Sequence, residues 1–290
     1  MAALDRMATT GVAPVRIAGN GMADDFRAVS VVWKRELIRF SRNRLRILTS
    51  LAQPILFLYI LGTGLSPLIS ASAHFSFRTF MFPGVLGMTI LFTSIFSAMS
   101  IVWDREFGFL REMLVAPVHR WTLVLGKCLG GATVASIQGA IILALAGTVG
   151  VPYSPEMLLT LLGEMALTAF ALTAFGVMLA ARISQMESFQ MVTQFFVLPM
   201  FFLSGAIFPL SDLPSWLAVL SKLDPLSYAI DPFRKAVFSQ ISLPLPLRET
   251  LDPGISWGSF QLPVWFELGM VAAAAVAMLA VAISQFSKTD

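Results

Sequence analysis

Residues Phe80–Val102 read FMFPGVLGMTILFTSIFSAMSIV, a stretch of 23 positions without a charged side chain. A bilayer core about 30 Å thick is crossed by roughly 20 apolar residues that each rise about 1.5 Å in a helix, so this stretch is long enough to span a membrane. Because lipid offers the backbone no hydrogen-bond partners, a segment at this depth has to satisfy its own polar groups as a helix. The stretch therefore predicts a membrane-spanning helix.

Similar windows recur along the chain. Of its 290 residues, 57% are hydrophobic and 13% are charged, whereas soluble domains are about half apolar and about a quarter charged. This composition excludes a water-soluble globule and a disordered chain, and the long uniform windows exclude a membrane β-barrel, whose strands alternate over about ten residues. The single cysteine, Cys128, excludes an intrachain disulfide. We predict an all-α polytopic membrane protein with six transmembrane helices, at residues 47–69, 80–102, 128–150, 157–180, 188–210 and 262–284.

The Lys and Arg residues are distributed unevenly between the two sides of this bundle. Fourteen of the 20 fall on the side that holds both termini, five fall on the other side, and Lys127 lies at a membrane edge. The positive-inside rule then predicts that both termini are cytoplasmic in a multi-pass protein of the cell membrane. Nine basic residues precede the first span, where they can contact anionic lipid headgroups, so the net charge of +3 does not indicate nucleic-acid binding. We expect a flexible cytoplasmic tail over 1–25, one transmembrane domain over 26–284 and a second tail over 285–290.

An amphipathic helix is predicted between Phe26 and Arg46. Apolar side chains recur there at steps of four, four and three, and basic side chains recur at similar steps on another face. This pattern is typical of a helix that lies in the membrane interface, with its apolar face down, and the alternative is a cytoplasmic extension of the first span. In either case the segment serves as an anchor, and the anchoring residues are expected to be Trp33, Arg35, Arg39, Arg42 and Arg46.

A second amphipathic segment, WDREFGFLREMLVAPVHR, covers Trp103–Arg120 between the second and third spans. Phe107, Leu110 and Leu114 fall on one helical face, charges of both signs surround them, and Pro117 ends the helix. The segment is too short to span the membrane and too apolar to lie free in water. Its apolar face therefore needs a partner, which is either another protein or the ends of its own bundle.

The long connection between the fifth and sixth spans is interrupted by proline. Residues 204–238 form an apolar run that Gly205, Pro209, Pro214, Pro225 and Pro232 divide into short pieces. Helix breakers at membrane depth are tolerated where protein or an aqueous cavity covers the loose backbone. We predict short half-helices that re-enter the outer leaflet, followed by an exposed loop up to residue 261.

This arrangement resembles the membrane subunit of type-2 ABC exporters, the ABC-2 permease family, and within it the daunorubicin and multidrug-resistance branch. Three stretches carry the resemblance: VVWKRELIRFSRNRLRILTSLAQPILFLYILG (31–62), IVWDREFGFLREMLVAPVHRWTLVLGK (101–127) and FFLSGAIFPLSDLPSWLAVLSKLDPLSYAIDPFR (201–234). They resemble the family's interfacial helix, coupling helix and re-entrant region. The middle stretch departs from the family in one place, because Gly108 is followed by Phe109 where relatives often have Gly-Thr.

The resemblance implies a permease without catalytic activity that works with a separate ABC ATPase and with a second permease copy, as a homodimer in membrane lipid. ATP and Mg²⁺ would bind to the ATPase, and no cofactor would bind to this chain. The nearest approach to a phosphate-binding Walker A motif agrees, since Gly126-Lys127 is followed by Cys128 where Ser or Thr is needed. The residues that the resemblance places against the ATPase are Glu106, Phe107, Leu110, Arg111, Glu112 and Met113.

The spans contain few polar side chains that could contact a substrate. An ionisable residue at membrane depth is a functional candidate by default, and amides there either line a path or join helices. The candidates for the substrate path are Glu164, Gln190, Gln194 and Phe195.

Other span residues carry structural expectations. Gly131, Ala135 and Gly139 form a face of small residues in the third span, which favours close helix packing. Lys127 is expected to extend to the lipid headgroups, and Glu267 is expected to be an interfacial carboxylate that reaches water.

The function predicted from these features is the export of a hydrophobic or amphipathic molecule, such as a drug or a lipid-linked compound. Export of polysaccharide or lipid-linked glycan is the alternative within the family. A secondary transporter would favour charge clusters or broken helices at the midplane, which the pattern does not contain. An enzyme is disfavoured because the two histidines, His74 and His119, are predicted on opposite sides of the membrane.

Overall fold

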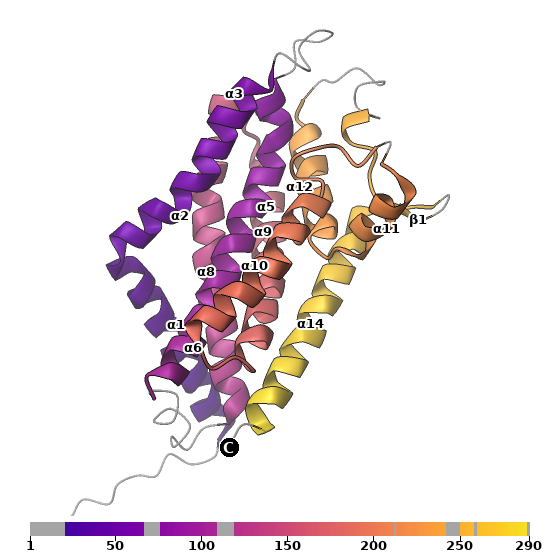
Figure 1. The fold of residues 1–290 in the computed structure, drawn as a ribbon. Helices are drawn as coiled ribbons and strands as arrows, with labels where there is room; N and C mark the ends of the chain where they lie inside the picture. Colours follow the sequence, from indigo (N-terminus) through magenta and orange to yellow (C-terminus); the bar gives the residue numbers. More distant parts are fainter. Residues whose placement is uncertain are drawn as a thin grey trace, which may run out of the picture.

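The computed structural model describes residues 21–66, 76–108, 119–211, 213–241, 250–257 and 260–288. Figure 1 shows an elongated helical bundle in which α6 and the C-terminus lie near one end and α3 lies at the other. The elements are α1 (Met22–Arg42), α2 (Arg44–Leu56), a π-helical turn (Phe57–Leu61), α3 (Gly62–Gly64), α5 (Phe77–Ser97), α6 (Met99–Glu106), α8 (Arg120–Leu143), a 3-10 turn (Ala146–Val149), α9 (Pro155–Ala180), α10 (Met186–Leu203), α11 (Ser215–Leu223), α12 (Ser227–Phe238), β1 (Ser256–Trp257), β2 (Phe260–Gln261) and α14 (Val264–Lys288).

The described part contains six helices that are long and apolar enough to cross a membrane, which confirms the predicted fold class. They cover Arg44–Gly64, Phe77–Glu106, Arg120–Leu143, Pro155–Ala180, Met186–Leu203 and Val264–Ser287. The largest difference from the expected boundaries is in the third helix, which begins at Arg120 and ends at Leu143. Its first two turns contain Arg120, which donates to carbonyl groups of α14, and Lys127, which pairs with carboxylates of α1 and α6. Because both side chains have partners inside the protein, these turns belong to the helix.

The centre of the bundle is formed by α5, α8 and α9, which pack against one another. The small-residue face of α8 lies in this centre: Ala135 is fully buried, and a Cβ on Gly131 would lie 2.6 Å from Thr173 of α9. The face therefore packs closely against its neighbours, as predicted. α2, α10 and α14 lie at the periphery and expose large apolar side chains, including Leu48, Phe195 and Trp265.

The N-terminal helix α1 packs along α8. Val29 and Val32 are buried, and a Cβ on Gly126 of α8 would lie 2.7 Å from Val32. The Trp33 indole N–H donates a hydrogen bond to Thr133 Oγ1 at 3.1 Å. Two residues of the predicted apolar face, Val29 and Trp33, therefore contact the third span.

α1 is a helix separate from the first span. The chain leaves the helical conformation at Asn43, whose side chain accepts a hydrogen bond from the N–H of Arg46 and caps α2. α1 also begins at Met22, inside the range expected to be a flexible tail, and Asp25 is buried. The rest of that tail, residues 1–20, lies outside the described residues.

Two short helices, α11 and α12, connect α10 to α14, where the proline pattern predicts half-helices. α12 packs against α5, α9 and α14. The segment expected to be a loop contains a short antiparallel pair, in which Ser256 lies opposite Gln261 and Trp257 opposite Phe260.

Candidate functional site

A cavity of about 650 Å³ lies between α1, α2, α5, α6 and α8, and Gln190 of α10 lies at its edge. This volume is within the range of about 300–1,000 Å³ that is typical of small-molecule sites. Its lining residues are Glu36, Arg39, Phe40, Asn43, Arg46, Thr49, Ser50, Gln53, Phe92, Thr93, Phe96, Ser97, Met99, Ser100, Trp103, Gly130, Gly131, Val134, Gln138 and Gln190. The cavity is therefore unusually polar for a site inside a membrane bundle.

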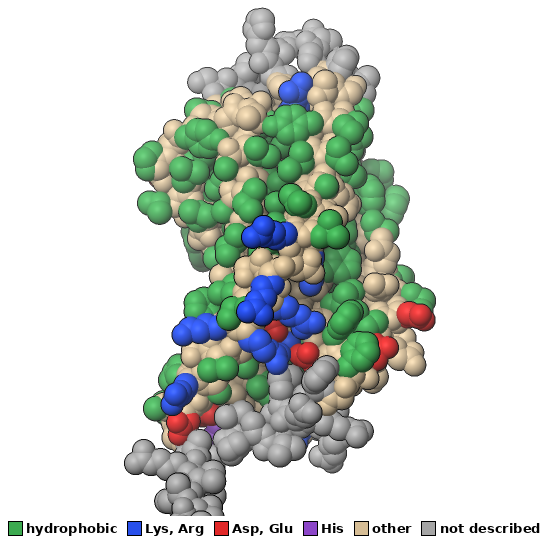
Figure 2. All heavy atoms as spheres, turned by 90° about the vertical axis from the view of Figure 1, so that its left-hand side faces the viewer, with side chains coloured by type: hydrophobic (Ala, Val, Ile, Leu, Met, Phe, Trp, Pro, Cys, Tyr) green, Lys and Arg blue, Asp and Glu red, His purple; other side chains and the backbone are tan. Residues whose placement is uncertain are grey.

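Neutral and charged polar groups both line the cavity. Gln138 donates to Ser50 Oγ at 2.6 Å and accepts a hydrogen bond from Thr93. The guanidinium groups of Arg39, beside Trp103 of α6, and of Arg46, beside Phe96 of α5, also line it. Figure 2 shows the side of the molecule formed by α1 and α2, where Lys and Arg side chains gather in the lower half and hydrophobic side chains cover much of the upper half.

A buried ion cluster forms the wall behind these arginines. Lys127 is 7% exposed, and its Nζ lies 2.7 Å from Glu36 Oε1, 2.8 Å from Asp104 Oδ2 and 2.9 Å from Ser100 Oγ. The cluster thus joins α1, α6 and α8. The prediction that Lys127 extends to lipid headgroups is wrong, because two buried carboxylates hold its ammonium group inside the bundle.

Two arginines of α1 extend this cluster toward the cavity. Arg35 Nη2 lies 3.1 Å from Asp104 Oδ2, and Arg39 Nη1 lies 3.8 Å from Asp104 Oδ1. The Arg39 guanidinium also lies 5.9 Å from the ring centre of Trp103. Two of the predicted anchor residues, Arg35 and Arg39 of α1, therefore contact α6.

The four predicted substrate-path residues do not form one site. Gln190 lines the cavity, but Gln194 and Phe195 lie on the exposed side of α10. Glu164 is 5% exposed, and its nearby charged group is Lys235 of α12. The sequence analysis missed Arg39 and Arg46 as cavity residues, because their spacing also fits an anchor on the membrane surface.

The predicted coupling segment is described only at its two edges. Trp103–Glu106 continue the second span as α6, and Phe107 is 61% exposed with its ring centre 5.3 Å from that of Trp103. The remaining predicted contact residues, Leu110, Arg111, Glu112 and Met113, lie outside the described residues.

Side chains at the N-terminal edge of the segment bind to α9 and α10. The Arg105 guanidinium donates to the carbonyl groups of Ala180, Ala181 and Ile183, at the end of α9. Glu106 Oε2 accepts a hydrogen bond from the N–H of Met186, the first residue of α10, at 3.2 Å.

Side chains at the C-terminal edge of the segment bind to α1 and α14. His119 Nδ1 lies 2.9 Å from the carboxylate oxygens of Asp25. Arg120 donates to the carbonyl groups of Phe286 and Ser287. Both edges of the segment are therefore attached to other helices at this end of the bundle.

A family model described as ABC-2 type transporter matches residues 27–238, which is well over half of the chain. The chain belongs to the ABC-2 type transporter family. It is a transport permease of the multi-pass kind, and permeases of this family generally work with an ABC ATPase.

Several named relatives are similar to the permease. It is 30% identical over 210 residues to transport permease ycf38 of Cyanophora paradoxa, covering 70% of this chain and 72% of the relative. It is 29% identical over 207 residues to nodulation protein J of Rhizobium leguminosarum bv. trifolii, covering 70% and 78%. It is 25% identical over 172 residues to the multidrug ABC transporter permease YbhR of Escherichia coli K12, covering 59% and 46%.

A second group of buried charges lies in the permease where α12 meets α14. Lys235 Nζ lies 2.6 Å from Asp231 Oδ2 and 2.9 Å from Glu267 Oε1. Glu267 has no exposed surface, so the prediction that it reaches water is wrong, and its carboxylate pairs with the partly buried ammonium group of Lys235. Burial lowers the pKa of Lys235, but the two carboxylates outweigh this effect and raise it above its usual value.

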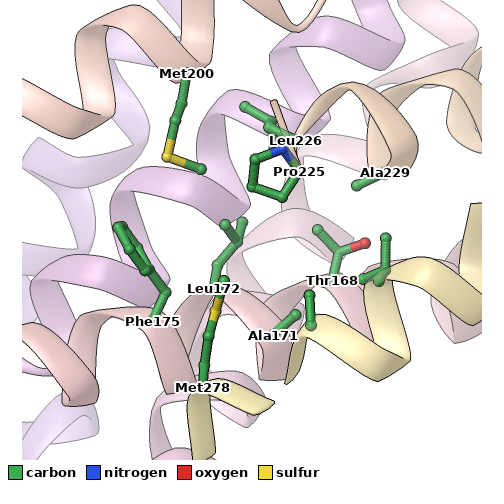
Figure 3. Close-up of a pocket in the computed structure, with 11 residues that line it drawn as sticks. Thr168, Ala171, Leu172, Phe175, Met200, Pro225, Leu226, Ala229 and Met278 are labelled. Atoms are coloured by element: carbon green, nitrogen blue, oxygen red, sulfur yellow. The ribbon is translucent and has the colours of Figure 1, made fainter. Parts of the chain in front are cut away.

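A small apolar pocket lies between α9, α10, α12 and α14 (Figure 3). Leu172, Phe175, Met200, Leu226 and Met278 point into it, and its volume is about 20 Å³. This is roughly the space of one water molecule. The pocket is too small for a substrate.

The turn between α11 and α12 makes the stability of the permease depend on pH. Asp224 accepts a hydrogen bond from the N–H of Leu226 at 3.1 Å, and burial raises the pKa of Asp224 to about 7, although its hydrogen bonds partly oppose this. Asp224 holds its proton more tightly in the native state than in the unfolded chain. The stabilisation of the native state by protonated Asp224 is therefore complete below about pH 4 and is lost as the pH rises to about 7. We expect the free energy of unfolding to fall by a few kcal/mol over this range.

Chemical denaturation in bicelles at a series of pH values measures this dependence. Asp224→Asn should flatten the slope, whereas Glu156→Gln, which neutralises an exposed carboxylate, should leave it close to that of the wild type. An unchanged slope in Asp224→Asn would contradict the assignment.

Proposed function

We propose that the permease is the membrane subunit of an ATP-driven exporter that moves a hydrophobic or amphipathic molecule out of the cytoplasm or the inner leaflet. The observation that carries the proposal is the position of the large cavity, which shares α6 with the predicted coupling segment. Trp103 of α6 lines the cavity and also contacts Phe107 at the edge of that segment. A movement of the segment would therefore reach the cavity wall directly.

The attachments at the two edges of the segment support the coupling role. Arg105, Glu106, His119 and Arg120 fasten the segment to α9, α10, α1 and α14. An ATPase that binds ATP and Mg²⁺ and pushes on the segment would move these helices together, as in rigid-body switching between two packed states. In this proposal the permease binds no nucleotide.

The rest of the assembly is part of the same proposal. The exposed apolar sides of α2 and α10 would face lipid or a second copy of the permease in a homodimer. The excess of basic residues near α1 and α6 favours the cytoplasmic side of the cell membrane for this end, and hence for both termini. A lipid-linked glycan is the second candidate substrate, favoured by the amides and hydroxyls that line the cavity.

Combining Phe107→Ala with Glu112→Lys tests the coupling role. The double variant should insert into the membrane normally, yet lose export by about a hundredfold or more, because both the apolar contact and the charge facing the ATPase are removed. Export and substrate-stimulated ATP hydrolysis are measured in proteoliposomes that contain the permease and its ATPase.

The matched control combines Phe260→Ala with Glu156→Lys. Phe260 is 60% exposed, close to the exposure of Phe107, and neither control residue belongs to the segment. The control should export normally. Normal export by the Phe107/Glu112 variant would overturn the assignment.

A further inference from the structure

We propose that the large cavity binds an anionic headgroup, of the phosphate class, on an amphipathic molecule, and that Arg39 and Arg46 hold this headgroup. This inference rests on the proposed transport function and adds to it a chemical feature of the substrate. The binding step itself does not depend on transport.

The charge balance at this end of the cavity is the first argument. Arg35, Arg39, Arg46 and Lys127 are positive, and Glu36 and Asp104 are the carboxylates that face them among the described residues, which leaves a net charge of +2. In a cavity between protein walls, where the effective dielectric constant is lower than in bulk water, such an excess attracts an anion more strongly than it would in water.

The ion pairs of these four cations show which of them can bind an additional anion. Lys127 lies within 2.8 Å of both carboxylates, and Arg35 lies 3.1 Å from Asp104 and 3.6 Å from Glu36, so these two cations balance the two carboxylates. Arg39 reaches Asp104 only at 3.8 Å, and its side chain is 41% exposed. Arg46 donates to the carbonyl oxygen of Phe96 at 3.1 Å, and no described carboxylate forms an ion pair with it.

Guanidinium groups suit a phosphate better than a neutral ligand. Each carries five N–H donors in a planar fork, and pairs of these donors match two oxygens of a phosphate. The Trp103 ring and the Phe96 carbonyl fix the two guanidiniums at the cavity wall, and each retains donors that can face the cavity.

The remainder of the cavity suits the rest of an amphipathic molecule. Phe92, Met99 and Val134 supply apolar surface, and Gln138 and Gln190 supply polar contacts. An amphiphile would therefore bind with its anionic group at the α6 end and its apolar part between α2, α5 and α8.

Photolabelling of the full-length permease in nanodiscs of neutral lipid tests the inference without ATPase or ATP. The probe is a photoreactive decyl phosphate, and the uncharged comparison is the corresponding photoreactive decanol. Each of Arg39→Gln and Arg46→Gln should weaken decyl phosphate binding about tenfold, and the double variant about a hundredfold. Arg39→Lys and Arg46→Lys, which keep the charge, should lose less than the glutamine variants.

The matched control is Arg27→Gln combined with Arg44→Gln, which removes two positive charges from exposed residues of the same two helices that do not line the cavity. This control should bind within about twofold of the wild type. Equal loss in the control and in the Arg39/Arg46 variant, or equal labelling by decanol, would overturn the inference.

Two further measurements identify the source of the headgroup. If ATP-driven export of decyl phosphate by the complete exporter falls in the Arg39/Arg46 double variant, the anion belongs to the substrate. If export of the probe is unchanged and phosphatidylglycerol displaces it in the binding assay, the site holds a membrane lipid. Probe binding that persists without any export would count against the proposed transport function and leave the binding site intact.

Discussion

Lys127→Met is expected to destabilise the permease by about 3–5 kcal/mol, the cost of leaving buried carboxylates without their cation. Lys127 Nζ contacts both Glu36 and Asp104, and all three side chains are largely buried. Methionine has a similar length but no charge, so packing is nearly preserved while the neutralisation is lost. The free energy of unfolding, measured by chemical denaturation in bicelles, should fall by this amount.

Two comparisons separate the lost charge from the lost volume. Lys34→Met changes an exposed lysine of α1 and should alter stability by less than about 0.5 kcal/mol. Adding Glu36→Gln and Asp104→Asn to Lys127→Met should recover much of the loss, because no buried carboxylate is then left without its cation. Arg35 and Arg39 lose Asp104 as a partner in this variant, but their side chains are 43% and 41% exposed, so solvent can stabilise their charges. A stable Lys127→Met variant, or a triple variant no better than the single one, would contradict this role of the cluster.

Gly84→Ala is expected to destabilise the permease by about 2–3 kcal/mol or more. A Cβ at this position would lie against the backbone of Ala206, with the Ala206 Cα at 2.7 Å. Backbone atoms cannot rotate away as a flexible side chain can, so α5 and the turn after α10 would have to separate. The unfolding midpoint in bicelles measures the effect.

Gly163→Ala is the matched control for this substitution. Gly163 lies within α9, and no atom lies within 4 Å of the position that its Cβ would take. Since alanine favours a helix over glycine, this variant should be more stable by roughly 0.5–1 kcal/mol. If Gly84→Ala behaved like Gly163→Ala, α5 and the Ala206 turn would not be in contact in the membrane.

The sequence was sufficient to predict the six helices, because an uncharged window of about 20 residues has few other solutions. It was less informative about where a helix begins when its first turns are charged. Arg120 and Lys127 place the start of α8 outside an apolar window, yet both are bonded to other helices. Hydropathy treats each charge as unpaired, whereas the folded chain pairs them.

The prediction of the candidate site was limited because contacts between distant parts of the chain decide which polar side chains share one cavity. Gln190, one of the candidates for the substrate path, lines the large cavity, but Glu164 belongs to another part of the bundle. Arg39 and Arg46 follow an amphipathic period, which fits a membrane surface as well as a cavity wall. α1 packs on α8, about a hundred residues away in the chain, and local spacing does not reveal such a contact.

The packing of α1 on α8 also determines the order in which the protein can be completed during synthesis. α1 leaves the ribosome first, but the groove that receives it forms only when the third span, which contains Gly126, has been made. Glu36 and Asp104 both precede Lys127 in the chain, but Glu36 can reach Lys127 only when α1 docks on α8. The three-residue ion cluster can therefore be completed only after the third span has been synthesised.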